Sequence, residues 1–216
     1  MTTLSNCKRL KTASMFGWAL MAVLSGHACA GTKTNQILPS SPIPVIQGFD
    51  HALLRAMHNK QPGGFLTRYG ILSPVIKKSF ASGRIAQLLV GPDWKRFDTL
   101  EQKQLVILFE HYTIANYAHE FRRFHGETFK VIDTKRYPDY QVVVTKLSQP
   151  SGKDHTFMYL MEPIQNQWKV VNIFVDGVSN IALLRSQYLY IVRKNGPAGL
   201  LRYLHHEIIK LEDSKR

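Results

Sequence analysis

This chain contains little cysteine and little acidic charge. Only two of its 216 residues are cysteines, Cys7 and Cys29, and 15 acidic residues stand against 28 lysines and arginines. No apolar run approaches the length of about 20 residues that a membrane-spanning helix needs. These absences argue against a domain held by disulfide bonds and against a bundle of membrane helices. A stable fold must therefore come from a hydrophobic core.

The first thirty residues have the organisation of a secretory signal peptide. A basic segment at 8–11 precedes ten apolar residues, Met15 to Leu24, and the small residues Ala28-Cys29-Ala30 follow. This order is typical of a cleavable signal. We therefore expect residues 1–30 to be removed on export. An uncleaved anchor and a lipoprotein acylated at Cys29 are the alternatives.

The expected mature chain has 186 residues and no cysteine. A domain of this size buries roughly 70% of its unfolded surface, which is enough for a core without disulfides. Loss of the three basic signal residues lowers the net charge from +13 to +10, because the first acidic residue is Asp50. For an exported protein, this charge favours anionic lipid headgroups or an acidic partner surface over nucleic acid. A solvated basic surface without a partner is the alternative.

Helical periodicity fills the first half of the expected mature chain. Segment 31–48 is rich in proline and serine and is expected to be a flexible tether, so the folded domain is expected to span 49–212. The predicted helices are 50–60 with Asp50 as N-cap, two short helices within 65–90 separated near Pro74 and again near Ser82-Gly83, and a long helix from an N-cap at Thr99 to about His125.

After Gly126 the hydrophobic period changes from 3.6 to 2, which predicts strands. Short loops of hairpin type connect these strands, so an antiparallel meander is expected. The expected fold class is α+β, with a four-stranded antiparallel sheet packed against a layer of helices. The predicted strands are Thr128–Asp133, Tyr140–Gln149, His155–Glu162 and Trp168–Asp176, and helices follow from Ser179 and from Pro197.

The stretch WKVVNIFVDGVS, at 168–179, is apolar on both faces of its predicted strand. Strand residues normally alternate between core and water, yet Asn172 is the only strongly polar residue between Lys169 and Asp176. The long helix also carries two apolar stripes. Such surface is either plain core or the lining of a ligand cavity. The candidate cavity residues are Val143, Leu147, Met158, Leu160, Val171, Ile173 and Val175 on the sheet and Phe109, Tyr112, Tyr117 and Phe121 on the long helix.

Sequence motifs for catalysis and metal binding are absent. There is no G-x-S-x-G, P-loop, G-x-G-x-x-G or H-E-x-x-H. His205 and His206 are adjacent, and adjacent side chains on a helix point about 100° apart, so the two cannot chelate a metal on their own. Asp176-Gly177 is explained as a turn. We therefore expect no enzyme, no metal and no cofactor.

The run WKVVNIFVDGVSNIALLRSQYLYIVRKNGPAGLLRYL, at 168–204, resembles the MlaC family, including its hopanoid-associated HpnM branch. The shared features are a tryptophan-led strand, an acid-Gly turn, a helix with the pair Gln187-Tyr188 and a Gly-x-x-x-Leu closing helix. Upstream, FLTRYGILSPVIKKSF, LVGPDW, EQKQLVILFEHYTIANYAHEF and GETFKV follow the family order, so the resemblance covers about 49–212. Ala81 departs from the Asp that many relatives have there.

The resemblance implies a periplasmic phospholipid-binding protein of the toluene-tolerance type, the auxiliary component of an ABC lipid transport system. Such carriers hold acyl chains in a cavity between a curved antiparallel sheet and helices, in a nuclear-transport-factor or cystatin-like arrangement. The implied partners are a phospholipid, an inner-membrane ABC transporter complex and an outer-membrane lipoprotein complex. A monomer with only peripheral membrane contact and no nucleic acid is expected. The closing helices add Ile181, Leu184 and Tyr188 to the candidate cavity residues.

Two other functions remain compatible with the sequence. A carrier or chaperone of hopanoids or other lipids would use the same fold with a differently shaped cavity. An exported adaptor that binds no lipid would use its basic surface for a partner and fill its core with side chains. The lipid content of the purified protein separates the three.

The signal peptide gives a direct prediction. N-terminal sequencing of the protein recovered from the periplasm should start at Gly31, because the small-residue site ends at Ala30. Recovery of an intact Met1 from a membrane fraction would contradict it.

Overall fold

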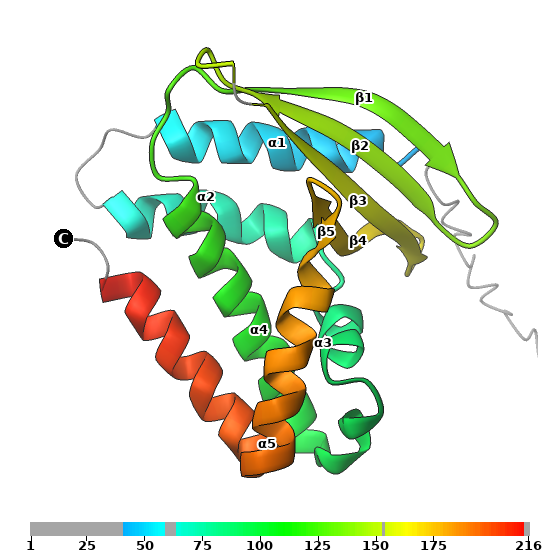
Figure 1. The fold of residues 1–216 in the computed structure, drawn as a ribbon, viewed down its shortest axis with the longest axis vertical. Coiled ribbons are helices and arrows are strands. Elements are labelled where there is room, and N and C mark those ends of the chain that lie inside the picture. Colours follow the sequence, from blue (N-terminus) through cyan, green and yellow to red (C-terminus); the bar gives the residue numbers. More distant parts are fainter. Residues whose placement is uncertain (1–40, 59–63, 153, 214–216) are drawn as a thin grey trace, which may run out of the picture. The chain divides into compact units, whose positions relative to one another are not determined.

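The computed structural model describes residues 41–58, 64–152 and 154–213. The expected signal peptide and the first ten residues of the expected tether, 31–40, lie outside these ranges. Helices come first, a sheet follows, and a long helix closes the chain (Figure 1). The elements are α1 Ile43–His58, α2 Gly64–Ser79, α3 Ser82–Val90, the 3-10 helix η1 Gly91–Arg96, α4 Thr99–Glu120, β1 Thr128–Arg136, β2 Gln141–Ser148, β3 Asp154–Ile164, β4 Gln167–Val175, β5 Val178–Ser179 and α5 Asn180–Asp213.

The sheet is an antiparallel meander in the order β1-β2-β3-β4-β5, which confirms the α+β class. The prediction of four strands is wrong, because β5 pairs back onto Phe174 and Val175. Asp176 and Gly177 both have positive φ, at 50° and 83°, as a two-residue hairpin turn requires. A strand of two residues shows no alternation in the sequence, so its pattern could not reveal it.

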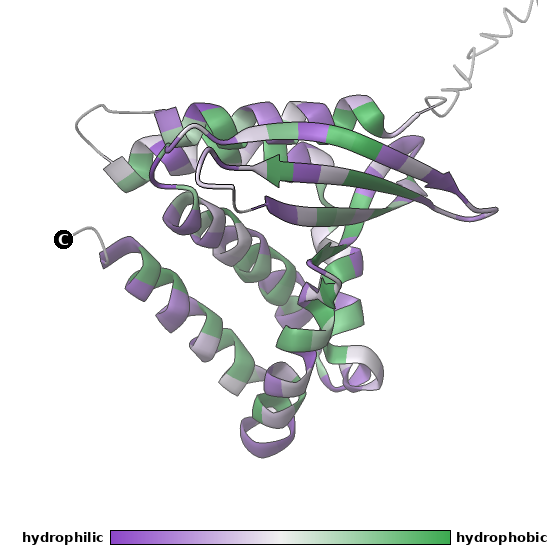
Figure 2. Ribbon diagram, turned by 45° about the horizontal axis from the view of Figure 1, so that its top comes forward, coloured by the Kyte–Doolittle hydropathy of each residue, from purple (hydrophilic) through white to green (hydrophobic). Residues whose placement is uncertain are grey.

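The helices cover one face of the curved sheet (Figure 1). Val143, Tyr159 and Ile173 stand in one cross-strand row on this face, and all three are buried. Hydrophobic and hydrophilic residues alternate along the strands in Figure 2, as expected for a sheet with one covered face. The core therefore lies between the sheet and the helices.

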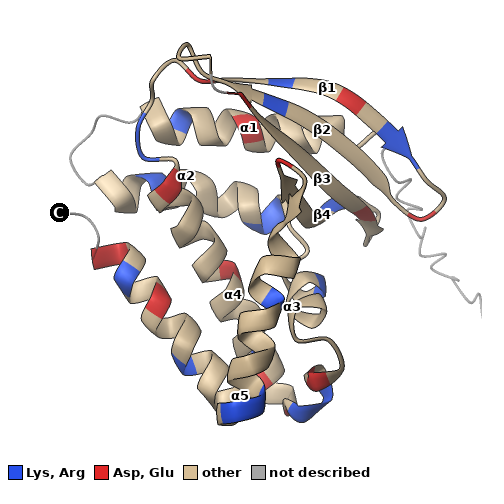
Figure 3. Ribbon diagram, in the orientation of Figure 1, with Lys and Arg blue, Asp and Glu red and all other residues tan. Residues whose placement is uncertain are grey.

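The two edges of the sheet differ. β1 is mostly exposed, carries charged residues (Figure 3), and shifts its pairing register around Ile132. β4 is covered at one end by β5, and its middle is held by the segment that links α2 to α3. There, the Ala81 amide donates to the Val170 carbonyl at 3.0 Å, and Phe80 forms an isolated bridge with Val170.

Helix α1 begins at Ile43, within the segment expected to be a tether. The Ser41 hydroxyl accepts a hydrogen bond from the Ile43 amide at 3.2 Å, and Pro44 occupies the first turn, where proline fits a helix. The N-cap at Asp50 is therefore wrong, because the prolines mark the start of the helix and α1 extends N-terminal of Phe49. Asp50 lies in the middle of α1 and is buried.

Two other helix boundaries differ from expectation. Pro74 does not divide α2, because the core side chains Leu72 and Ile76 hold the helix on either side of it. The N-cap of α4 is Asp98, which exchanges two hydrogen bonds with Glu101 in a capping box, one residue before the predicted Thr99. The same helix ends at Glu120 rather than near His125.

The predicted break between the last two helices is confirmed. α5 is continuous by its hydrogen bonding, but Gly196 lies inside it at φ 69° and ψ −179°, followed by Pro197. Glycine tolerates this positive φ without a steric cost. The two halves, orange and red in Figure 1, therefore run in different directions.

Asp50 is an acid placed among aromatic rings. Its carboxylate accepts a hydrogen bond of 3.4 Å from the buried Tyr159 hydroxyl, and Phe49 and Tyr117 pack nearby in edge-to-face contact. Burial raises the pKa of Asp50 to about 7, and the hydrogen bond from Tyr159 offsets only part of this rise. The protonated form therefore suits this position.

Replacement of Asp50 by Asn gives a test of this environment. The folded-state pKa lies above the ordinary value of 3.8, so the stability that protonated Asp50 supplies is complete below about pH 4 and is lost as pH rises to about 7. Over that window, wild type should lose stability relative to Asp50→Asn by up to about 1.4 kcal/mol per pH unit. Urea unfolding at several pH values measures it. The exposed Asp139→Asn is the control, and parallel profiles for wild type and Asp50→Asn would contradict the assignment.

Candidate ligand-binding pocket

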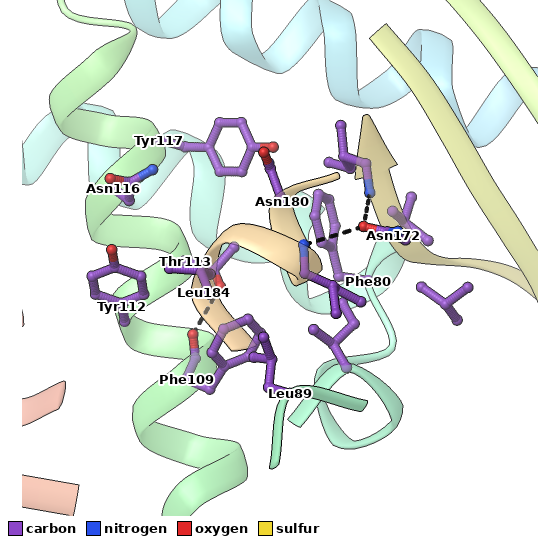
Figure 4. Close-up of a pocket in the computed structure, with 15 residues that line it drawn as sticks. Phe80, Leu89, Phe109, Tyr112, Thr113, Asn116, Tyr117, Asn172, Asn180 and Leu184 are labelled. Atoms are coloured by element: carbon purple, nitrogen blue, oxygen red, sulfur yellow. Dashed lines mark hydrogen bonds between the residues drawn. The ribbon is translucent and has the colours of Figure 1, made fainter. Parts of the chain in front are cut away.

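A partly open pocket of about 90 Å³ lies between β4 and the helices (Figure 4). β4 supplies one wall, α3 and α4 supply others, and the start of α5 closes the space. The lining is mostly apolar and contains no charged residue. Its members are Phe80, Ile85, Leu89, Phe109, Tyr112, Thr113, Asn116, Tyr117, Val170, Val171, Asn172, Ile173, Asn180, Ile181 and Leu184.

A β-bulge in β4 explains why its sequence is apolar on both faces. Leu160 pairs with Asn172 and the next residue, Met161, pairs with Val170, so Val171 is an extra residue in β4. The bulge interrupts the alternation of side chains. Four consecutive residues, 170–173, consequently line the pocket.

Asn172 fixes the corner where β4, β5 and α5 meet. Its amide nitrogen donates to the Ser179 hydroxyl at 3.0 Å, and its amide oxygen accepts from the backbone amides of Ile173 at 2.8 Å and Ile181 at 3.4 Å. Ser179 in turn accepts from the Ala182 amide at 3.2 Å, so the predicted Ser179 cap is confirmed. Asn172, the only strongly polar residue between Lys169 and Asp176, thus holds the start of α5 against the pocket.

Half of the candidate cavity residues meet at the pocket. They are Phe109, Tyr112, Tyr117, Val171, Ile173, Ile181 and Leu184. Val143, Leu147 and Val175 share the helix-facing side of the sheet but lie outside this lining, as do Phe121 and Tyr188 on the helices. Met158 and Leu160 occupy the opposite face, because they pair with Val144 and Val142 rather than with the Val143 row. A continuous wall that includes these two residues is therefore wrong.

The sequence interpretation missed several lining residues. Ile85 and Leu89 lie four positions apart on α3, a spacing that marks a shared helical face and was available in the sequence. Phe80 reaches the pocket through its bridge to Val170, which only the tertiary structure reveals. The polar residues Thr113, Asn116 and Asn180 carry no motif that would have singled them out.

The chemistry of the lining suits an apolar ligand. Burial raises the pKa of both Tyr112 and Tyr117, so their hydroxyls stay protonated. The lining contains no histidine, carboxylate or cysteine that would form a nucleophile and base pair. In the described ranges, no three His, Cys, Asp or Glu side chains gather into a metal-binding group.

The Tyr188 side chain is buried beside this pocket, and its hydroxyl group is left without a hydrogen bond to any described residue. Its side chain is 1% exposed and packs edge-to-face on Tyr203, with ring centroids 6.1 Å apart. Its hydroxyl has no hydrogen-bond partner among the described residues. A buried hydroxyl without a partner costs about 1–3 kcal/mol. The packing of α4 against α5 therefore includes a penalty at this tyrosine.

The fold and the pocket define a class: an α+β protein whose uncharged, apolar pocket lies between an antiparallel sheet and a layer of helices. The family model described as MlaC protein matches residues 49–206. The chain therefore belongs to the MlaC family, as its resemblance predicted.

Among solved structures, this chain is similar to a phospholipid-binding protein from Ralstonia solanacearum, determined in complex with a phospholipid. The two share 18% sequence identity, the TM-score is 0.69, and the match covers 82% of this chain and 99% of that one. This likeness establishes the fold. No curated protein sequence matches the chain.

Helix length and composition bear on membrane topology. Across the described ranges, none of the helices combines the length and the apolar character needed to cross a bilayer.

Removal of the Tyr188 hydroxyl tests the penalty at this site. Tyr188→Phe keeps the ring packing and deletes the unpartnered group, so the free energy of unfolding should stay level or rise by about 1 kcal/mol. Tyr203→Phe is the matched control, because the Tyr203 hydroxyl accepts a hydrogen bond of 2.7 Å from Gln187. Chemical denaturation of both variants measures the difference. A loss of more than about 1 kcal/mol in Tyr188→Phe would show that the hydroxyl has a partner.

Proposed function

We propose that this protein is a periplasmic phospholipid carrier that moves lipid between the inner and outer membranes as the soluble component of an ABC-type transport system. Its proposed partners are an inner-membrane ABC transporter complex and an outer-membrane lipoprotein complex. Membership of the MlaC family and the phospholipid-bound Ralstonia solanacearum structure support this function. The observation that carries it is the uncharged pocket between β4 and the helices.

The energetics of lipid transfer suit such a pocket. Exposure of two acyl chains to water costs on the order of 20 kcal/mol, at about 0.8 kcal/mol per methylene. A pocket lined by Phe, Ile, Leu and Val replaces one apolar environment with another, so lipid can leave a bilayer at a small net cost. Binding and release need no chemical step. A carrier therefore has no use for a nucleophile.

The volume of the pocket sets a condition on binding. A volume of about 90 Å³ is well below that of pockets for drug-sized ligands, which span about 300–1,000 Å³. Two acyl chains therefore enter only if α5 and the facing wall separate. The start of α5 is held by Asn172, by Ser179 and by Arg185, which donates to the Leu88 carbonyl at 3.2 Å, and Leu183 on its outer side is 60% exposed. We propose that this half of α5 moves when lipid enters.

The distribution of charge fits a carrier that meets many membrane surfaces. Lysines and arginines are spread over several helices and strands rather than collected on one element (Figure 3). The apolar lining contains none of them. The positive charge thus acts on encounter with anionic surfaces and leaves the affinity of the pocket to apolar contacts.

Lipid extraction from the mature protein purified from its native periplasm tests the proposal. Native mass spectrometry should show a bound phospholipid. Co-purifying hopanoid would favour the related hopanoid carrier, and protein without any lipid would favour the adaptor.

A pair of variants connects the lipid to this pocket. Ile173→Gln places an amide in the lining, and the folded protein should retain less than about a tenth of the wild-type lipid, because an unpaired buried amide costs about 1–3 kcal/mol. Val144→Gln introduces the same amide on the opposite face of the sheet and should retain its lipid. Melting temperature and lipid stoichiometry are measured together. An Ile173→Gln variant that loses stability but keeps full lipid stoichiometry would place the site elsewhere.

A further inference from the structure

Two asparagines in the pocket lining remain without polar partners. Thr113 donates its hydroxyl to the Phe109 carbonyl at 2.8 Å, and Asn172 is occupied by Ser179 and backbone amides. The side chains of Asn116 and Asn180, by contrast, form no hydrogen bond with any described residue. Both are partly buried. Their amide groups are therefore available to a ligand inside an otherwise apolar lining.

The two asparagines come from opposite walls. Asn116 lies on α4, and Asn180 is the first residue of α5. In Figure 4 both lie in the upper part of the view near Tyr117, whereas Phe109 and Leu89 lie in the lower part. The two amides therefore lie near Tyr117, at a distance from the apolar end formed by Phe109 and Leu89.

This arrangement matches one part of a phospholipid. An amide NH₂ group offers two donors, and an ester carbonyl is an acceptor without charge. In a diacyl phospholipid, the two ester carbonyls stand where the acyl chains leave the glycerol, between the apolar tails and the phosphate. A phosphate would call for Arg or Lys, and the lining has neither. Neutral donors in a pocket with an apolar end thus suit the ester region.

We propose that Asn116 and Asn180 donate hydrogen bonds to the glycerol ester carbonyls and make the pocket selective for ester-linked, two-chain lipids. The inference rests on the proposed function and extends it to the linkage of the lipid. An ether-linked lipid with the same chains and headgroup lacks the carbonyl acceptors. A polycyclic hydrocarbon lacks them as well. Either ligand would leave the two amides unpaired in the pocket.

Competition between ester and ether lipids tests the selectivity. The mature protein is incubated with vesicles that contain equal amounts of diester and diether phosphatidylglycerol with matched chain lengths, and native mass spectrometry measures the ratio of the two in the protein. Wild type should prefer the diester lipid at least about fivefold, since each of the two net hydrogen bonds contributes about 0.5–1.5 kcal/mol and 1.4 kcal/mol is tenfold. The Asn116→Leu/Asn180→Leu variant, nearly isosteric, should bind both lipids equally. Thr113→Val is the matched control and should keep the preference, because its hydroxyl is already bonded to Phe109.

The outcomes separate this inference from the proposed function. Equal uptake of the two lipids by wild type would overturn ester recognition and leave phospholipid carriage intact. Uptake of neither lipid would count against carriage itself. The wild-type comparison is decisive even if the double variant does not fold. An undiminished preference in both folded single variants, Asn116→Leu and Asn180→Leu, would assign the selectivity to other groups and overturn the role of both asparagines.

Discussion

The bulge at Val171 is the constraint on which the pocket depends. Regular pairing of β3 with β4 would send every second residue of β4 to the outer face, as it does for Met158 and Leu160 on β3. One additional residue breaks this alternation, and the four residues 170–173 all line the pocket. The position of Asn172 then follows, because the same run places its amide where it meets Ser179 and the first turn of α5. A local irregularity of one strand thus sets the wall and the closure of the pocket.

The closure of the pocket depends on the first half of α5. This half begins on the Asn172 and Ser179 hydrogen bonds, buries the Tyr188 hydroxyl without a partner among the described residues, and ends at the bend at Gly196. Packing that leaves a polar group unsatisfied is less stable than packing that satisfies it. The unpartnered hydroxyl therefore lowers the stability of the packing around the first half of α5.

Periodicity predicted the order of helices and strands because both periods are strong in this chain, and family resemblance supplied the curved sheet. The pattern could not predict the bulge at Val171, since an extra residue in a strand looks like ordinary apolar sequence. It placed Met158 and Leu160 in the pocket for the same reason, as alternation does not say which face is covered. The start of α1 was missed because Pro44 indicates a loop and a helical first turn equally well. Asn116 and Asn180 required the packed structure, because only the absence of partners distinguishes them.

The two sheet edges also bear on how the folding chain avoids aggregation. An exported protein that folds after translocation presents strand edges to other unfolded chains, and a bare apolar edge promotes aggregation. In this sheet, β1 has charged side chains and a break in register at Ile132, while β5 and the Ala81 amide shield β4, the more apolar strand. The more apolar edge of the sheet is thus covered, and the exposed edge is one to which another strand pairs poorly.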